Sequence, residues 1–392
     1  MLDRCDRVQI AVHDAAKAAE RYRLLLGCEV ARRDHSRHLA AKRTVLAVGE
    51  SEFELCEADG AGRTQDFLTR RGEGLMTAGY CTADLDNMAK RWEGLGVAYD
   101  RDGEQLYLAS DVTFGLPIVI SESTYRPRVG PVSFLYETTN TLISDWRRVA
   151  AVYAGLFGLD PTRFSEIGSE RFGYIGTLTL FDPPNRLDRI ELSQVTDNVH
   201  AMGRYAHKHG DSLYMCYVEV HDWPNVRQRL LDANARYTPR GAEPVTEPDG
   251  GWVHPKELHG LLLGVSRTGV AWDWSQSKRD DELFDFDYVD YEAGWYSTRD
   301  TKFMARELGR GEAEIAFPRS RFKYVLDEAI TLQGWDGYAL DIEDTNASRV
   351  MMRTYIVKDR LYRMLVTTKG DLKSMSAATR FLDSLRLAET RP

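Results

Sequence analysis

Two glutamates stand between large apolar neighbours on segments that we expect to be strands. Glu54 lies in the segment EFELCEA, and Glu191 lies in the segment RIELSQ. A carboxyl group held in an apolar pocket has a raised pKa and can pass a proton to and from a substrate. Strand alternation offers a second reading, in which both side chains simply point to solvent. Both readings stay open, and Glu191 is our first candidate for a catalytic group.

Histidine and tyrosine supply the other acid–base candidates. His254 and His259 lie five residues apart in the segment HPKELHG, and an imidazole titrates near neutral pH. In one interpretation both imidazoles lie at the mouth of a pocket. In the other, His254 belongs to a turn that leads into a strand, and His259 lies at the edge of the sheet. Tyr217 can donate a hydrogen bond to a substrate oxygen as the partner of Glu191.

Arg7 is the candidate for charge recognition. The two-residue period of a strand places Arg7 on one face with Gln9, and places Tyr217 on one face with Met215. Arg7 can pair with a substrate carboxylate or with Glu54. We favour the Arg7–Glu54 pair, in which Arg7 has a structural role and does not bind substrate.

Two further clusters fit structural roles better than chemical ones. His200, His207 and His209 precede an apolar strand, and the spacing of the last two does not place them on one helical face. We expect them on a surface helix. A group of aromatic residues follows, for which packing between domains is commoner than a pocket wall: Trp272, Trp274, Phe284, Phe286, Tyr288, Tyr291, Trp295 and Tyr296.

Four copies of one repeated unit carry these residues. In each copy an apolar strand ends at an Asp, an amphipathic helix follows, and a turn residue comes 12 or 13 positions after the Asp. The four residues are Asp14, Asp84, Asp145 and Asp222. Further strands follow each helix, which predicts four β-α-β-β-β units over residues 5–275.

Composition is that of a soluble globular protein of several domains. The chain has 392 residues, of which 43% are hydrophobic and 28% charged, and its net charge is −9. An acidic chain is not expected to bind nucleic acid or an anionic membrane. It has no apolar run of about 20 residues for a membrane span, and no signal peptide is recognised, which predicts a cytoplasmic protein. The five scattered cysteines are expected to be buried and reduced.

The repeated units resemble the vicinal oxygen chelate superfamily, which includes glyoxalase I, methylmalonyl-CoA epimerase, the extradiol dioxygenases and the bleomycin-resistance proteins. The resemblance implies an α+β fold in which two units form one module, an open curved mixed sheet around a pocket. We therefore expect one module over residues 1–125, a second over 126–275, and a small C-terminal α+β domain over 276–392. The end of that last domain weakly resembles the PsbP/Mog1 kind.

The same resemblance indicates where a divalent metal would be held. The superfamily uses four side chains of a module, two from the first strands and two from the last strands of its units. In the first module these positions carry Arg7, Glu54, Thr77 and Val119. In the second module the first position falls near residues 131–133, where there is no His, and the other three carry Glu191, Met215 and Gly264. One carboxylate per module is too little for such an ion. We therefore expect no metal and no other cofactor, and take Arg7, Glu54, Thr77 and Met215 as candidate substrate-binding residues.

Three functional hypotheses follow. The first is a lyase or isomerase that acts on an oxygenated, apolar or aromatic metabolite by acid–base chemistry without the metal. In it Glu191 is the base, with Tyr217 or His259 as its partner. The second is a non-catalytic binding protein of the bleomycin-resistance type. The third is a metal-dependent dioxygenase or epimerase with atypical ligands, namely His254, His259 and Glu191. The expected partner is a small molecule, with no nucleic acid and no membrane, and a monomer and a homodimer both stay open.

Overall fold

The computed structural model describes residues 1–182, 187–240, 248–267, 283–290, 294, 300–316, 322–344, 349–368 and 372–387. The chain divides into two compact units, Met1–Ser277 and Lys278–Pro392. Among the described helices none is long and apolar enough to cross a membrane. All five cysteines are buried and free, as expected.

The first two repeats form one eight-stranded mixed sheet with the strand order β2-β3-β4-β1-β5-β8-β7-β6. The two units meet at the antiparallel pair β1 and β5, and each first strand is parallel to the last strand of its own unit. The elements are β1 (Arg4–Val12), α1 (Ala15–Leu26), β2 (Glu29–Ser36), β3 (Ala41–Val48), β4 (Ser51–Ala58), α2 (Arg63–Arg71), β5 (Gly74–Thr82), α3 (Leu85–Gly94), β6 (Asp100–Asp102), β7 (Gln105–Leu108) and β8 (Ile118–Glu122).

The third and fourth repeats form a second sheet with the same arrangement, β10-β11-β12-β9-β13-β16-β15-β14. The fold predicted for the repeats is therefore confirmed. The elements are β9 (Val132–Leu142), α4 (Trp146–Phe157), η1 (Pro161–Arg163), β10 (Ser165–Ser169), β11 (Tyr174–Leu180), β12 (Arg189–Val195), α5 (Ala201–His209), β13 (Ser212–Val220), α6 (Trp223–Asp232), β14 (Tyr237–Arg240), β15 (Gly250–Val253), η2 (Pro255–Glu257) and β16 (Leu263–Arg267).

The repeated Asp begins a helix in every unit. Its side chain accepts a hydrogen bond from a backbone N–H of the first helical turn in α1, α3, α4 and α6, which satisfies a donor that a helix start leaves without a partner. Gly27 and Gly158 end α1 and α4 in the left-handed conformation that favours glycine. The repeat is therefore a strand, a capped helix and a stop.

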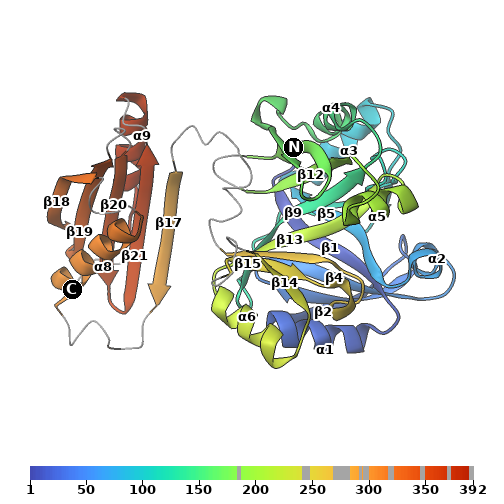
Figure 1. Cartoon of the computed structure of the whole chain (residues 1–392), viewed down its shortest axis with the longest axis horizontal. Coiled ribbons are helices and arrows are strands. Elements are labelled where there is room, and N and C mark those ends of the chain that lie inside the picture. The colour runs from blue at the N-terminus through green and yellow to red at the C-terminus, as the bar shows by residue number, and fades with distance from the viewer. Residues whose placement is uncertain are drawn as a thin grey trace. The chain divides into compact units, whose positions relative to one another are not determined.

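One hydrophobic cluster lies beneath both sheets. It takes Val8, Ile10 and Val12 from β1, together with buried residues of α1, α3, α4, α6, β9 and β13. Helix α1 packs against α6, as Figure 1 shows, and α3 packs against α4. The indole N–H of Trp92 on α3 donates to the carbonyl of Leu156 on α4. The two modules therefore share one core.

The other face of each sheet carries its own smaller cluster, and we call these faces the first cup and the second cup. On β1, Arg7, Gln9 and Ala11 alternate with the residues of the shared core, so they belong to the first cup. Helix α2 packs on that cup through Leu68. The corresponding cluster of the second cup includes Tyr217.

The C-terminal unit has an antiparallel sheet with the order β17-β21-β20-β19-β18. Its elements are β17 (Leu283–Asp290), α8 (Thr301–Ala316), β18 (Phe322–Leu332), β19 (Trp335–Asp344), β20 (Arg349–Val357), β21 (Arg360–Thr368) and α9 (Leu372–Leu382). The sequence pattern predicts a strand in EAEIAFP, residues 312–318, and this is wrong up to residue 316. Helix α8 continues through that stretch, because glutamate and alanine favour a helix.

The aromatic residues expected to pack between domains are only partly described. Phe286 and Tyr288 are exposed on β17, where their rings contact Tyr362 of β21. Trp272, Trp274, Tyr291, Trp295, Tyr296 and the side chain of Phe284 lie outside the described residues.

Candidate active site

Arg7 occupies the centre of the first cup and is surrounded by carboxylates. Its Nη1 lies 2.7 Å from Glu54 Oε1 and 3.1 Å from Glu52 Oε2, and its Nη2 lies 2.6 Å from Asp6 Oδ2. The predicted Arg7–Glu54 pair is therefore confirmed. Both side chains are buried, Glu54 completely. This contact is an internal ion pair, and a substrate carboxylate would have to compete with it.

Glu54 is held in its ionised form. Burial opposes ionisation, but Arg7 and Arg43 outweigh it and lower the pKa of Glu54 below its usual value. Arg43 Nη1 lies 3.1 Å from Glu54 Oε2, and Gln9 Nε2 donates to the same oxygen at 2.8 Å. A carboxylate fixed by several donors in this way is a poor proton shuttle.

A second carboxyl pair lies at the equivalent place in the second cup. Strand pairing sets Glu137 opposite Arg189 and Thr139 opposite Glu191, just as it sets Arg7 opposite Glu52 and Gln9 opposite Glu54 in the first sheet. Glu137 is thus the counterpart of Arg7. The expectation that this position falls near residues 131–133 is wrong: Glu137 lies eight residues before Asp145, whereas Arg7 lies seven residues before Asp14.

The two cups carry the same cross-strand ion pair with its charges reversed. In the first, the cation Arg7 is on the first strand and the anion Glu52 is on the last strand of the unit. In the second, Glu137 is on the first strand and Arg189 is on the last, with 2.5 Å between Arg189 Nε and Glu137 Oε2. In the second cup Arg189 is therefore paired with Glu137, and Glu191 follows Arg189 two residues later on the same strand.

Glu191 is the carboxyl group whose proton affinity this arrangement raises. Burial and the negative charge of Glu137 raise the pKa of Glu191 well above its usual value, and Arg189 opposes this more weakly. The hydroxyl groups of Thr139, at 3.1 Å, and Ser193 donate to its two oxygens. Glu54 and Glu191 occupy the same place in their sheets and have opposite protonation preferences.

Aromatic and apolar side chains surround this carboxyl pair. The buried cluster of the second cup consists of Tyr136, Leu187, Met215 and Tyr217, with Phe134, Tyr214, Trp252 and Leu262 packed against it. The Trp252 indole N–H donates to the Tyr217 hydroxyl at 2.9 Å. Burial raises the pKa of Tyr217 above its usual value, so its hydroxyl keeps its proton. Met215, a candidate from the sequence, lies on β13 opposite Thr139.

The two candidate histidines have other partners. His259 Nδ1 lies 2.9 Å from Glu73 Oε2, a residue of the first module, and His254 Nε2 lies 3.2 Å from Thr238 Oγ1. Among the described residues neither imidazole contacts Glu191. Thr77 is buried in the first cup opposite Gln9. The roles proposed from the sequence for His254, His259 and Thr77 stay predictions.

The donor set does not suit the metal of the resembled superfamily. In the first cup the only carboxylate among the four positions, Glu54, is paired with Arg7 and Arg43. In the second, Glu137 is paired with Arg189. The described residues contain no cluster of three His, Cys, Asp or Glu side chains arranged to hold a metal ion. The atypical set of His254, His259 and Glu191 is thus not brought together.

Sequence reasoning missed Glu137 and Arg189. The signal lay in the segments EFEL and RIEL, which differ in charge at the residue before the shared apolar–Glu–Leu pattern. An arginine in place of a glutamate on a buried strand face requires an acid opposite it. That requirement would have pointed to Glu137 on β9.

Comparison with known proteins supports the fold. No known family model and no curated protein matches the sequence. A mutant of 4-hydroxymandelate synthase from Streptomyces coelicolor matches 68% of this chain and 93% of its own, with 13% identity and a TM-score of 0.53. Methylmalonyl-CoA epimerase from Mycobacterium tuberculosis matches 36% of this chain and 93% of its own, with 18% identity and a TM-score of 0.31. A fusion of a xylose isomerase-like TIM barrel and a 4-hydroxyphenylpyruvate dioxygenase matches 71% of this chain and 52% of its own, with 12% identity and a TM-score of 0.48. With its two eight-stranded sheets of the same strand order, the N-terminal unit of this chain has the vicinal oxygen chelate fold in its two-module form.

Proposed function

We propose that the second module is an acid–base active site that binds a small oxygenated metabolite with an apolar or aromatic body. The reaction would be that of a lyase or isomerase, without the metal of the resembled superfamily. One observation carries the proposal: Glu191 and Glu137 share an apolar cup, and the pKa of Glu191 is raised by burial and by Glu137. Paired carboxyl groups with displaced pKa values are a recurrent device for proton transfer near neutral pH.

Glu191 is the group that would exchange protons with the substrate. It begins protonated and donates to a carbonyl oxygen of the substrate. The carboxylate so formed then removes a proton from the neighbouring carbon, which leaves an enol. Return of that proton to another carbon or to the other face, with transfer of the enol O–H proton back to the carboxylate so formed, gives the isomer and leaves Glu191 protonated as before. Glu137, fixed by Arg189, would not touch the substrate, and its negative charge keeps the proton affinity of Glu191 high.

Tyr217 is the better partner for Glu191 in this scheme. It belongs to the same cup and can donate a hydrogen bond to the substrate oxygen that gains charge. His259 is in contact with Glu73 of the first module and is not needed for the scheme. The ring of Tyr217 also lies over Gly264, where a Cβ atom would come within 2.0 Å of the ring. Gly264 therefore sets the position of the phenol.

The test is solvent exchange in deuterium oxide. Purified full-length protein is incubated with a panel of aryl-substituted 2-oxo and 3-oxo acids, and deuterium incorporation beside the carbonyl is followed by NMR. We expect exchange of at least one probe, slowed by about 10²-fold or more in Glu191→Gln, since general acid–base groups contribute about 10²–10⁴-fold. Glu166→Gln, at an exposed residue of β10 in the same module, serves as the matched control and retains the rate.

Binding without exchange is the alternative outcome. If probes bind to the second cup, and wild type and Glu191→Gln bind equally with no deuterium incorporated, the module sequesters its ligand and the acid–base proposal is wrong. The aromatic wall of the cup is compatible with that result. Protection of β12 and β13 from hydrogen exchange would locate the bound probe.

A further inference from the structure

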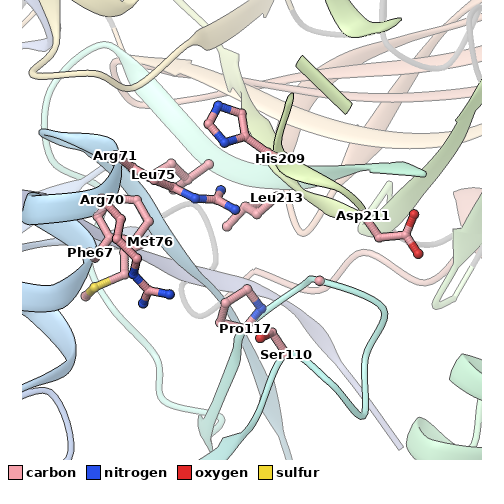
Figure 2. A pocket seen from close by; sticks show the side chains of 11 residues that line it. Phe67, Arg70, Arg71, Leu75, Met76, Ser110, Pro117, His209, Asp211 and Leu213 are labelled. Carbon is pink, nitrogen blue, oxygen red and sulfur yellow. The ribbon is translucent and has the colours of Figure 1, made fainter. Parts of the chain in front are cut away.

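A separate cavity lies at the seam between the two modules. It has a volume of about 260 Å³ and is lined by residues of α2 and β5 and of the loop before β8 in the first module. In the second module it is lined by the last residue of α5 and by residues that follow that helix. Figure 2 shows Phe67, Arg70 and Arg71 on one side of it, with His209 and Leu213 facing them. None of these residues belongs to the carboxyl pair described above.

Two arginines supply the positive charge in the lining of this cavity. Arg70 and Arg71 are exposed, and His209 is partly exposed. Among the described residues neither arginine forms an ion pair with a carboxylate. Arg70 Nε donates to the backbone carbonyl of Asp66 at 3.2 Å, and Arg71 Nη1 donates to the Tyr205 hydroxyl at 3.4 Å. In a chain of net charge −9, two arginines that line one cavity, with no acidic partner among the described residues, are well placed to bind an anion.

The one carboxylate in the lining is already satisfied. Asp211 Oδ1 accepts hydrogen bonds from the backbone N–H groups of Ile143, at 2.6 Å, and Ser144, at 3.0 Å, and its other oxygen accepts from the Ser144 hydroxyl. Figure 2 shows its carboxylate directed away from the two arginines. Asp211 therefore fixes the loop of the second module and does not neutralise the cavity.

The rest of the lining is apolar. Phe67, Leu75, Met76, Pro117 and Leu213 contribute side chains to the cavity. The Arg71 guanidinium carbon lies 5.9 Å from the centre of the Phe67 ring, within the range of a cation–π contact. A ligand that fits has one anionic group and a small apolar body, because ligand pockets for drug-sized molecules are usually larger, about 300–1,000 Å³.

We infer that the seam cavity is a binding site for a small organic monoanion, an aryl or alkyl carboxylate held by Arg70 and Arg71 with its apolar part on Phe67 and Leu213. This inference does not rest on the function proposed for the second cup. A ligand here would contact both modules at once, and would stabilise their packing.

Calorimetric titration of the full-length protein tests the inference. The probes are benzoate, phenyl phosphate and inorganic phosphate. We expect benzoate to bind, and Arg70→Gln or Arg71→Gln to weaken it by about tenfold each, the equivalent of one charge-assisted hydrogen bond. Arg23→Gln, at an exposed side chain in the last turn of α1, is the matched control with unchanged affinity. Phenyl phosphate should bind comparably, and inorganic phosphate at least tenfold more weakly, because it lacks the apolar body.

Three results would overturn the inference. The first is unchanged benzoate binding in the double variant Arg70→Gln/Arg71→Gln, with native circular dichroism. The second is loss of benzoate binding in Glu191→Gln, which would place the probe in the second cup. The third is inorganic phosphate binding as tightly as benzoate, which would show that the site reads charge alone. Hydrogen-exchange protection of residues 67–76 and 209–213 by benzoate would support it directly.

Discussion

Replacing Glu191 by glutamine should remove a specific dependence of stability on pH. The folded state raises the pKa of this carboxyl above its ordinary value of 4.5, so the folded chain keeps a proton that the unfolded chain releases. The contribution of protonated Glu191 to the free energy of unfolding is complete when the pH is below that ordinary pKa, and it is lost as the pH rises toward the folded pKa. While this difference persists, the free energy of unfolding falls by about 1.4 kcal/mol per pH unit.

Glutamine keeps the shape and the acceptor oxygen of the protonated acid. The Thr139 and Ser193 hydroxyls can still donate to it, and its amide can donate to Glu137. Glu191→Gln should therefore match wild type near pH 4.5 and exceed it progressively at pH 5, 6 and 7. Glu54→Gln should behave oppositely. The pKa of Glu54 is lowered, so its contribution is complete above its ordinary pKa and is lost only as the pH falls through the folded value.

The assay is urea unfolding at several pH values. The C-terminal unit can unfold separately, so hydrogen exchange of peptides from β9 and β12 should report on the N-terminal unit. The informative quantity is the difference between variant and wild type, because other titrating groups cancel in it. Parallel pH profiles for wild type and Glu191→Gln between pH 5 and 7 would refute the protonated Glu191 and, with it, the acid–base proposal.

Three further predictions concern the framework around the site. Arg7→Met should lower the free energy of unfolding in a urea titration by about 3–5 kcal/mol, because it leaves buried carboxylates without their cation. The control is Arg37→Met. The Arg37 side chain is 79% exposed, so this variant should change the free energy of unfolding by less than about 0.5 kcal/mol. Gly115→Ala places a Cβ atom 1.6 Å from the Asp211 carbonyl oxygen at a φ of +77°, whereas the Cβ atom of Gly103→Ala, at a φ of +60°, meets nothing within 4 Å. Thermal unfolding should show that Gly103→Ala lowers the free energy of unfolding by about 1–2 kcal/mol through backbone strain, and that Gly115→Ala lowers it by a further ~1–3 kcal/mol through the clash. Equal losses in the two variants would argue against close packing at the seam between the modules. Burial raises the pKa of all five cysteine thiols, so mass spectrometry should find none alkylated by iodoacetamide at pH 7 in the native protein and all five in urea.

The fold could be predicted from the sequence because each repeat is marked by residues that begin and end a helix through local interactions. Asp14 and Gly27 are a cap and a stop whose physics depends only on neighbouring residues. The same signals recur at Asp145 and Gly158. Strand pairing and module number then follow from repetition. The strand predicted at 312–318 failed because its apolar pattern is short and its residues favour a helix.

The candidate site was accessible only in part. Glu54 and Glu191 look alike in the sequence, each as an acid between apolar residues. Their different protonation depends on Arg7 and Glu137, which reach them from another strand. Glu137 lies eight residues before Asp145, whereas Arg7 lies seven before Asp14, so a fixed count back from the repeat Asp does not align the two positions. Long-range register, and the charge that it places opposite each acid, is what the sequence alone left undetermined.

The shared core limits what can be removed from this chain. Because one hydrophobic cluster contains residues of both sheets and of four helices, deleting either module would expose the apolar face of the other. The cups lie on the opposite faces of the sheets, and their polar residues are not part of that cluster. A duplicated scaffold of this kind lets the side chains of one cup differ from those of the other, as Arg7 and Glu137 do, while each whole copy is kept as a structural partner. Engineering should follow the same division: redesign one cup at a time, and leave the chain whole.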